Sequence, residues 1–331
     1  GIFPAREAIV MQQQSRGISG ITVEEVFIGN GVSELIDMSL RALLNPGDEI
    51  LIPSPDYPLW SAATVLNGGK SIFYECSATN NFLPNLEQIE SKISSKTKAI
   101  VVINPNNPSG AVYDRNTLEA IADLAERNNL VLLSDEIYDQ MIYDDAEFIP
   151  MASIAKNCVC LTFSGLSKIY RACGYRVGWA VFSGDVDRAS QYQLGMTKLS
   201  ALRLCSNVPG QWAVQTALGG IQSIKSLVKP EGRLYQSRNT VINRAKESSY
   251  LHLERPMGAM YAFLKLDERF NQKLDDYKFA HELLEKHHVL IAPGSSFNTP
   301  YNNHFRITTL PDSDTIDIVF DRIEDCLKQY S

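Results

Sequence analysis

Seven short apolar runs, separated by helix-like stretches, limit the folds open to this chain of 331 residues more than any other pattern in it. The runs are rich in Val, Ile, Leu and Phe, as buried strands are. They cover residues 26–28, 49–52, 71–74, 99–103, 130–133, 159–163 and 177–182. The stretches between them have helical periodicity, as in Leu118, Ile121 and Leu124. Strands that alternate with helices predict βαβ units, right-handed crossovers and a mainly parallel sheet, which is an α/β fold.

The last third of the chain has a different pattern. A polar, helix-prone stretch at 232–248 is followed by an apolar run at 260–266 and a helix at 277–286. A short run at 289–292 and an amphipathic helix at 312–330 complete the chain. This pattern predicts a smaller α+β domain. Because Pro230 and Gly232 punctuate the chain, we expect a large domain over 1–229 and a small domain over 230–331.

Charge and cysteine usage exclude several classes of protein. The chain has 31 basic and 38 acidic residues, and this net charge of −7 argues against a nucleic-acid partner. None of the six cysteines forms a Cys-x-x-Cys pair, so we expect no metal site and reduced thiols, as in a cytoplasmic protein. The apolar stretches are only as long as strands, and residues 1–6 are no signal peptide, so no membrane association is expected.

Lys168 is the first candidate for chemistry, because it follows the sixth apolar run within a few residues. A lysine just beyond a strand lies where open α/β sheets bind ligands, and a half-buried amine can attack an aldehyde. An ordinary surface lysine is the alternative. Arg176 favours the functional interpretation, because it lies between small residues in Gly174-Tyr175-Arg176-Val177-Gly178. Such an arginine can approach a phosphate closely and bind it through two parallel hydrogen bonds.

Asp135 is the second candidate, at the end of the apolar run 130–133. An acidic residue there is costly unless it has a partner. A protonated pyridine nitrogen would be a suitable partner, and Tyr138 lies three residues further on, close enough to reach an oxygen on the same ring. A metal-binding or capping pair formed with Glu136 remains equally open on this segment alone.

Two turns follow predicted strands. Residues 104–110 read Asn-Pro-Asn-Asn-Pro-Ser-Gly, a rigid turn whose Asn side chains can point into one cleft. Residues 29–31 read Gly-Asn-Gly and precede an apolar helix, so they can present free backbone N–H groups to an anion. A plain loop and a simple helix cap at Ser33 are the respective alternatives.

Two single side chains complete the candidates. Tyr57 lies among prolines and could stack on a flat ring, although such aromatic residues are more often packing residues. Arg306 lies within the strand-like segment His304-Phe305-Arg306-Ile307-Thr308. A buried arginine needs an anion, which is either a substrate carboxylate or an internal acidic residue.

Taken together and in order, these segments resemble the class I and II aminotransferases, which are fold-type I enzymes that use pyridoxal 5'-phosphate (PLP). The motifs are Asn-Pro-x-Asn-Pro-[Ser/Thr]-Gly, Ser-Asp-Glu-x-Tyr, Ser-Lys-x-Tyr-(x)4-Gly-x-Arg-x-Gly and Phe-Arg-Ile, and with the glycine turn they extend from Gly31 to Arg306. The segments 165–171 and 203–209 look most like bacterial alanine aminotransferases. The resemblance implies a mainly parallel seven-stranded sheet with helices on both faces and a smaller α+β domain.

The resemblance also implies roles for individual residues. Lys168 becomes the Schiff-base lysine and proton shuttle, Asp135 the partner of the pyridine nitrogen, and Tyr138 a ligand of the ring hydroxyl. Asn107 shares the ring hydroxyl with Tyr138, and Tyr57 stacks on the ring. The substrate α-carboxylate is bound by Arg306 with Asn107. The implied phosphate contacts come from Gly31, Val32, Ser33, Ser167 and Arg176. Amino acids and 2-oxo acids are the implied substrates, with alanine, pyruvate, glutamate and 2-oxoglutarate expected.

The chain departs from the family pattern at two places. Many relatives have a phosphate-binding serine three residues before the lysine, where this chain has Gly165. Relatives also have an N-terminal arm and a tyrosine-bearing loop before the segment that matches residues 1–8. We therefore expect an N-terminally incomplete large domain. A homodimer is implied, because the family's active site lies at a dimer interface.

Three other functions stay open at this point. A PLP-dependent lyase or acyltransferase would share the fold, since fold and cofactor do not fix the reaction. An inactive, truncated fragment that keeps the fold is a second possibility. A nucleotide-binding α/β protein is disfavoured, because Gly29-Asn30-Gly31 matches neither the dinucleotide-binding nor the P-loop spacing of glycines.

Overall fold

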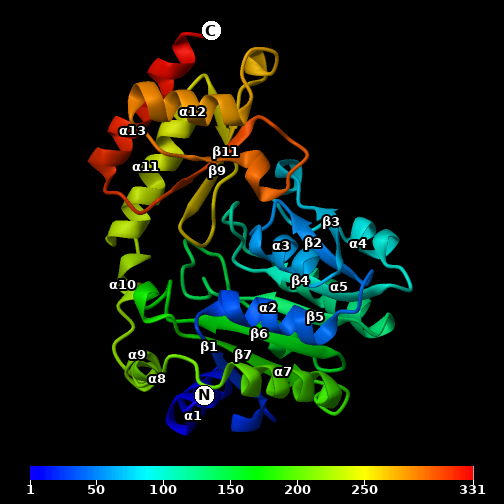
Figure 1. Cartoon of the computed structure of the whole chain (residues 1–331). Helices are drawn as coiled ribbons and strands as arrows, with labels where there is room; N and C mark the ends of the chain where they lie inside the picture. The colour runs from blue at the N-terminus through cyan, green and yellow to red at the C-terminus, as the bar shows by residue number, and fades with distance from the viewer. Residues whose placement is uncertain (331) are drawn as a thin grey trace.

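All seven predicted apolar runs are strands of one sheet in the computed structural model, which describes residues 1–330 (Figure 1). Within that range the sheet order is β1-β7-β6-β5-β4-β2-β3. Strand β7 alone runs antiparallel to its neighbours, so the prediction of a mainly parallel sheet is confirmed. The strands are β1 Val26–Gly29, β2 Glu49–Ser54, β3 Lys70–Glu75, β4 Thr97–Ile103, β5 Val131–Asp135, β6 Val159–Gly165 and β7 Gly178–Gly184.

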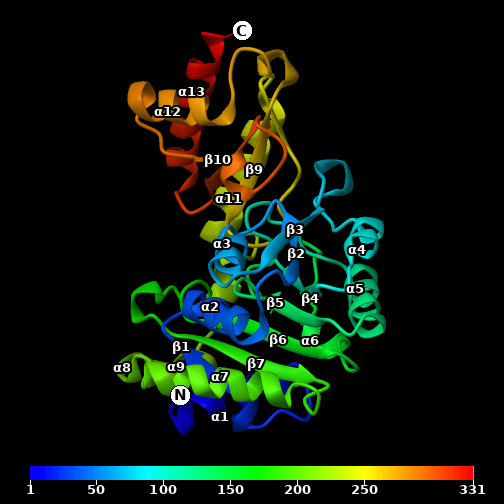
Figure 2. The same cartoon turned by 45° about the vertical axis from the view of Figure 1, so that its right-hand side comes forward.

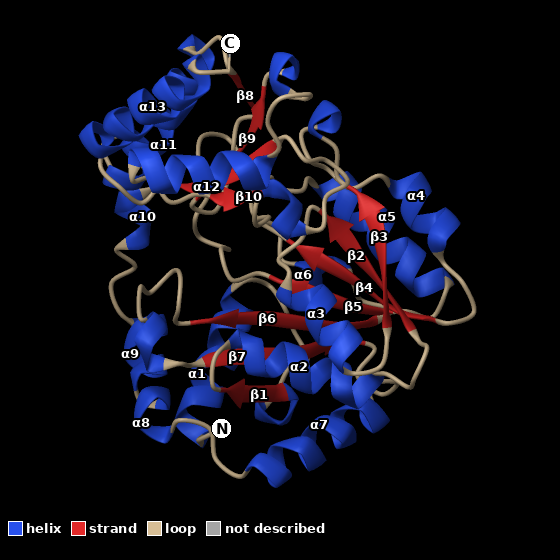
Figure 3. Ribbon diagram, turned by 45° about the horizontal axis from the view of Figure 1, so that its top comes forward, coloured by secondary structure: helices blue, strands red, loops and turns tan. Residues whose placement is uncertain are grey.

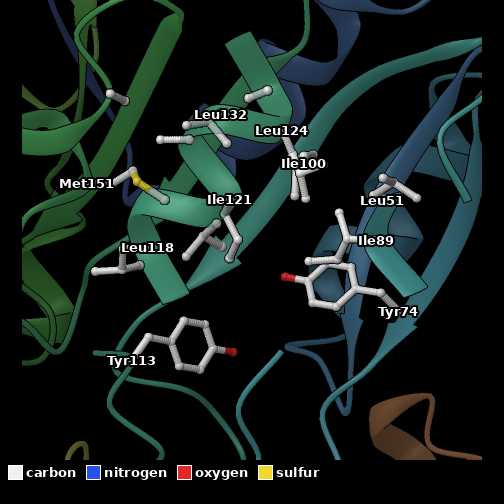
Figure 4. Close-up of a cluster of buried hydrophobic side chains, with 14 of the residues drawn as sticks. Leu51, Tyr74, Ile89, Ile100, Tyr113, Leu118, Ile121, Leu124, Leu132 and Met151 are labelled. Atoms are coloured by element: carbon white, nitrogen blue, oxygen red, sulfur yellow. The ribbon is translucent and has the colours of Figure 1, made fainter. Parts of the chain in front are cut away.

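Both faces of the central strands are buried, which is why β4, β5, β6 and β7 are mostly apolar. Along β4, Ile100 and Val102 belong to one buried cluster, and Val101 and Ile103 belong to another. Figure 4 shows the first cluster, which includes Ile121 of α5 Arg115–Arg127 and Leu132 of β5. The helices that cover this first cluster are α4 Leu86–Lys92, α5 and α6 Met151–Ile154. The helices that cover the second cluster, on the other face of the sheet, are α2 Val32–Leu43, α3 Leu59–Leu66 and α7 Ser190–Arg203 (Figure 2).

Helix α5 illustrates how the sequence builds one of these covering elements. Asp114 caps its first turn by accepting a hydrogen bond from the backbone N–H of Thr117 at 2.8 Å. Leu118, Ile121 and Leu124 then repeat at helical spacing and are buried against the sheet. The predicted helix before residue 130 is therefore confirmed.

The edge of the sheet formed by β1 and β7 packs on a further layer. Helix α1 Phe3–Ser15 buries Ala5 and Ile9 against Val26, Ile28 and residues of β7. Helix α9 Ala213–Gly219 lies beside α1, preceded by the short helix α8 Val208–Gln211 and followed by α10 Ile224–Leu227. Figure 3 shows how far the sheet twists between β3 and β1.

The last third forms a separate antiparallel sheet with helices, above the large sheet in Figure 1. Its order is β10-β11-β9-β8, with β8 Leu251–Leu253, β9 Tyr261–Leu266, β10 Ala292–Pro293 and β11 His304–Thr308. Its helices are α11 Arg233–Glu247, α12 Asp276–His287 and α13 Ser313–Lys328, as the helical patterns predicted. The predicted run at 289–292 is mostly not a strand. Only its last residue, Ala292, pairs with the sheet, together with the following Pro293.

The sheet topology gathers residues of distant segments at one edge. Strands β4, β5 and β6 end together, since Ile103 pairs with Asp135 and Asp135 pairs with Phe163. Strand β7 starts at that edge because it runs in the opposite direction, with Gly178 paired to Gly165. Residues that follow β4, β5 and β6 and residues that precede β7 must therefore meet there.

Across residues 1–330, no helix has both the length and the apolar character needed to cross a membrane. All six cysteines are free thiols.

Candidate active site

A cavity of about 320 Å³ lies where the edge of the large sheet faces the four-stranded sheet. It is within the size range of pockets for small molecules and cofactors. Nearly every residue singled out in the sequence lines it, although these residues come from six separate segments. They are Val32, Ser33, Tyr57, Asn107, Asp135, Tyr138, Ser167, Lys168, Arg176 and Arg306.

Lys168 enters the cavity from the loop that follows β6. Its neighbours Leu166 and Ile169 are buried and anchor that loop, whereas Lys168 itself is half-buried. The ammonium nitrogen lies 6.0 Å from the centre of the Tyr138 ring, and its positive charge lowers the pKa of Asp135. An amine, a phenol and a carboxyl group therefore share one small space.

Asp135 is the last residue of β5 and is almost completely buried. Its carboxylate accepts a hydrogen bond from the indole nitrogen of Trp60 at 3.2 Å and a longer one from the backbone N–H of Ile137 at 3.4 Å. Burial raises the pKa of Asp135 to about 6, although Trp60 and Lys168 act in the opposite direction. A positive charge placed beside this carboxylate would favour its ionised form.

Glu136 points away from the cavity, so the two adjacent acidic residues do not act as a pair. Its carboxylate accepts hydrogen bonds from Ser134 Oγ and from the backbone N–H of Met151, both at 2.9 Å. No group of His, Cys, Asp and Glu side chains suited to a metal ion occurs among residues 1–330. The metal-pair interpretation of this segment therefore has no support.

The glycine turn lies beside Arg176. Gly31 has a φ of 89°, and a Cβ atom added there would lie 2.4 Å from Arg176 Nη2. Gly31 is also the N-cap of α2, so Ser33 is the second residue of the helix and does not cap it. The free N–H groups of the first turn, the Ser33 hydroxyl and a guanidinium group thus converge, which is a favourable setting for an anion.

Only one asparagine of the loop at 104–110 lines the cavity. Asn104 Oδ1 accepts from the backbone of Tyr113 at 3.0 Å, and Asn106 Oδ1 accepts from Ser109, so these two side chains hold the loop in shape. Asn107 Oδ1 accepts a hydrogen bond from Arg306 Nη1 at 2.9 Å. The expectation that the Asn side chains point into one cleft is therefore correct for Asn107 and wrong for the other two.

Arg306 projects from β11 between two aromatic rings. Its guanidinium carbon lies 4.3 Å from the ring centre of Tyr261 and 4.7 Å from that of Phe297. No acidic side chain among residues 1–330 lies within 4.0 Å of the charged nitrogens of Arg306, Arg176 or Lys168. A cavity with three such cations is suited to a ligand that carries more than one anionic group.

The sequence of the chain matches the sequence model of one family over most of its length. The family described as Aminotransferase class I and II matches residues 8–323. The chain belongs to this family.

Individual aminotransferases are similar over the full length of the chain. The "Glutamate-pyruvate aminotransferase AlaA" of Escherichia coli (strain K12) is 45% identical over 331 residues, which are 100% of this chain and 82% of that protein. The "Alanine aminotransferase" of Mycobacterium tuberculosis (strain H37Rv) is 46% identical over 331 residues, or 77% of its length. Both similarities extend through every segment that lines the cavity.

Solved structures of aminotransferases have the same fold. A crystal structure of an aminotransferase from Escherichia coli has a TM-score of 0.97 at 44% identity and covers 100% of this chain and 82% of that one. The alanine aminotransferase from Pyrococcus furiosus has a TM-score of 0.94 at 34% identity, covering 99% and 82%. The fold is therefore that of the fold-type I aminotransferases, as the sequence predicted.

In this aminotransferase, Gly165 leaves no room for the serine found in many relatives. A Cβ atom added at Gly165 would lie 2.8 Å from Val177 O and 2.9 Å from the Cα atom of Gly178. Both are backbone atoms of the segment that leads into β7, which cannot move as easily as a flexible side chain. The start of β7 therefore lies too close to β6 for a side chain at this position.

Sequence reasoning missed several residues that line or support the site. Trp60 is completely buried and reaches Asp135 from α3. Tyr261, Cys173, Ile103 and Ile137 line the cavity. The position of Tyr261, at the start of the predicted strand 260–266, was the only signal, and it did not distinguish a site residue from a core residue.

Arg203 does not belong to the cavity of this aminotransferase. It is the last residue of α7, where its Nε lies 3.2 Å from a Glu34 carboxylate oxygen and its Nη2 donates to Ile28 O at 3.3 Å. These contacts tie α7 to β1 and α2, on either side of the glycine turn.

Proposed function

We propose that this chain is a PLP-dependent aminotransferase that moves an amino group between alanine or glutamate and the matching 2-oxo acids, pyruvate and 2-oxoglutarate. One observation carries the proposal: a single cavity combines a lysine, a buried carboxylate and two arginines without acidic partners. The choice of substrates rests on the relatives named for alanine and for glutamate and pyruvate.

The residues fit the cofactor in number and in chemistry. A phosphate needs hydrogen-bond donors and positive charge, which Ser33, Ser167, Arg176 and the first turn of α2 supply. Gly31 keeps the space beside Arg176 free of a side chain. A pyridine ring needs a carboxylate at its nitrogen, for which we propose Asp135. It needs hydrogen-bond donors at its hydroxyl, for which we propose Asn107 and Tyr138. It also needs an aromatic ring to stack on, for which we propose Tyr57.

When bound, PLP supplies an electron sink for the charge that develops at the substrate Cα. Asp135 would keep a proton on the ring nitrogen, which needs an ionised carboxylate. The Trp60 hydrogen bond and, in the cofactor-free protein, the charge of Lys168 favour that ionised form against the effect of burial. The Lys168 amine would hold the cofactor and then move the proton at Cα as a general base and acid.

Arg306 and Asn107 would bind the substrate α-carboxylate. Arg306 Nε has no hydrogen-bond partner among the described residues, and Nη1 already contacts Asn107. Every amino acid carries an α-carboxylate, so this contact orients substrates without selecting among side chains. Binding at a fixed distance from Lys168 then removes much of the entropic cost of reaction.

We further propose that residues 1–229 carry the cofactor, that residues 230–331 supply the carboxylate anchor, and that the active protein is a cytoplasmic homodimer. Exposed apolar side chains support a homodimer: Leu202, Leu204 and Ile221 are at least 79% exposed, and Trp212 is 58% exposed. All four lie within residues 202–221, a segment that we propose contributes to the interface with the partner subunit. Sedimentation equilibrium tests the mass of the assembly.

A panel of amino donors tests the reaction. Alanine, glutamate, aspartate and phenylalanine are each incubated with pyruvate or 2-oxoglutarate, and the new amino acid is quantified. We expect alanine with 2-oxoglutarate, and glutamate with pyruvate, to be the best pairs. A strong preference for phenylalanine would refute the substrate assignment and leave the reaction type intact. Turnover that needs no 2-oxo acid would instead indicate a lyase.

A further inference from the structure

Tyr261 contacts two groups of the site that carry different tasks. It is the first residue of β9, lines the cavity and is 7% exposed. Its hydroxyl oxygen lies 2.9 Å from the hydroxyl oxygen of Tyr138, and the two rings meet edge-on at an interplanar angle of 83°. No other hydrogen-bond partner of either hydroxyl occurs among residues 1–330.

The face of the Tyr261 ring supports Arg306. In the sheet register Arg306 is paired with Phe263, so Tyr261 is its diagonal neighbour on the same face of the sheet. The guanidinium carbon lies 4.3 Å from the Tyr261 ring centre, with the Phe297 ring also in contact at 4.7 Å. This arrangement fixes the plane of the guanidinium group while Nη1 is held by Asn107.

We propose that Tyr261 is a positioning residue that acts through two separable parts: its hydroxyl orients the Tyr138 phenol toward the cofactor, and its ring face holds Arg306 for the substrate carboxylate. This inference rests on the proposed function, since it gives a task to a side chain that contacts Tyr138 and Arg306. It adds a residue that no motif in the sequence identifies.

The hydroxyl part follows from the donors available. A phenol has one proton to donate and an oxygen that can accept. If the Tyr261 hydroxyl donates to Tyr138, the single proton of Tyr138 is left for an acceptor in the cavity. Burial raises the pKa of Tyr138 well above its ordinary value, and the adjacent Tyr261 hydroxyl raises it further, so Tyr138 stays protonated. A chain of two hydroxyls also strengthens the terminal donor.

The ring part follows from electrostatics in a partly dry site. An arginine over an aromatic face is attracted by the quadrupole of the ring, and this attraction is larger where water is excluded. A phenylalanine at position 261 would keep this contact and lose the hydroxyl. A leucine would lose both, which makes the two parts separable by mutation.

The experiment uses the full protein reconstituted with PLP. The first readout is the pH titration of the visible absorption of the bound cofactor, which reports on the donor at its ring oxygen. The second is the dissociation constant of propionate, a carboxylate probe without an amino group, measured from the change in that absorption. Tyr192→Phe is the matched control, because its buried hydroxyl donates to Ser39 O and neither residue lines the cavity.

In Tyr261→Phe the midpoint of the titration should rise by about half a unit to one unit, the equivalent of one hydrogen bond. Its propionate affinity should stay within about twofold of wild type, since the ring remains. In Tyr261→Leu the same midpoint shift should come with propionate binding weakened roughly three- to thirtyfold. Tyr192→Phe should change neither readout.

Two results would overturn the inference while leaving the proposed function intact. One is a Tyr261→Phe midpoint equal to that of wild type. The other is a loss of propionate affinity in Tyr261→Phe as large as in Tyr261→Leu, which would remove the separate task of the ring face. A wild-type protein that takes up no coloured cofactor would refute the proposed function, and the inference with it.

Discussion

The indole nitrogen of Trp60 donates a hydrogen bond to the carboxylate of Asp135 across 3.2 Å, in a place where both side chains are almost completely buried. Trp60 is in turn held by an edge-on contact with Phe163, at 5.3 Å between ring centres. Helix α3 therefore supplies a hydrogen-bond donor to the carboxylate at the end of β5, and this hydrogen bond favours the ionised form of Asp135.

Replacing Trp60 by phenylalanine should weaken PLP binding, because the carboxylate loses its only side-chain donor among the described residues. Hydrogen bonds to charged groups contribute roughly 1.5–3 kcal/mol, so we expect a loss of about tenfold or more in affinity. A titration of the apoprotein with PLP, followed by absorbance, measures it. Trp179→Phe is the control, since Trp179 is equally buried and its indole nitrogen has no partner within residues 1–330. Equal losses in the two variants would contradict the prediction.

Asp135→Asn should separate stability from catalysis. Burial raises the pKa of Asp135 to about 6, above its value of 3.8 when unfolded, so the folded apoprotein must hold an unfavourable buried charge at neutral pH. Because the folded protein binds this proton more tightly than the unfolded chain, the protonated carboxyl adds to the free energy of unfolding. That contribution is fully present below pH 4 and is lost as the pH rises through 6. We therefore expect the apoprotein variant to be more stable than wild type at pH 8, by on the order of 1–3 kcal/mol.

This difference should shrink as pH falls from 6 to 4, and thermal unfolding of both apoproteins across that range measures it. Turnover should be nearly eliminated at every pH, since an amide cannot hold the ring nitrogen protonated by charge. An apoprotein variant less stable than wild type at pH 8, or turnover close to wild type, would contradict this account of Asp135.

Lys168→Ala should abolish both turnover and the covalent, borohydride-reducible bond to PLP. Lys168 is the only lysine that lines the described cavity, so no other amine is in place to substitute for it. Peptide mapping after borohydride reduction of the wild-type protein identifies the labelled residue. Label on any other lysine would show that the assignment of Lys168 is wrong.

Much of this site could be predicted because strand ends are visible in a sequence. An apolar run that stops at a polar residue marks the edge of a parallel sheet, which is how Asp135 and Lys168 were found. Arg306 was found for a related reason, since a charge inside a strand-like segment needs an anion. These signals depend only on neighbouring residues in the sequence, so they can be recognised without knowing how the elements pack together.

The supporting residues could not be predicted, because their roles depend on packing between distant segments. Trp60 is 75 residues from Asp135 along the chain, and Tyr261 is 123 residues from Tyr138. Each looks like an ordinary core residue in its own helix or strand. The direction of an indole N–H or a phenol O–H is decided only when the elements pack together.

Arg306→Ala should weaken the binding of all amino-acid substrates by a similar factor, because each carries the same α-carboxylate. Losing two charge-assisted hydrogen bonds should cost roughly a hundredfold or more in affinity. Arg306→Lys keeps the charge but not the planar group that lies between Tyr261 and Phe297, so it should recover only part of the loss. Apparent dissociation constants for alanine and glutamate measure both. A variant that binds alanine normally and glutamate poorly, or the reverse, would show that Arg306 discriminates between substrate side chains.

Gly165→Ser would restore the serine that many relatives have before the lysine, yet it should harm this protein. A Cβ atom there would lie 2.8 Å from Val177 O and 2.9 Å from Gly178 Cα, so β6 and the start of β7 must separate. Overpacking of this kind costs typically about 1–3 kcal/mol, which should appear as a lower melting temperature of the apoprotein.

The displaced segment leads directly into β7 from Arg176, so the proposed phosphate contact should weaken as well. We therefore expect PLP affinity to fall rather than rise, even though the substitution adds a hydroxyl group that is able to donate to a phosphate. Gly174→Ser is the control in the same segment, because nothing lies within 4 Å of a Cβ atom added at Gly174. Melting curves and PLP titrations of the two variants measure the difference. Tighter PLP binding in Gly165→Ser, with an unchanged melting temperature, would mean that the close approach of β6 and β7 does not limit this position.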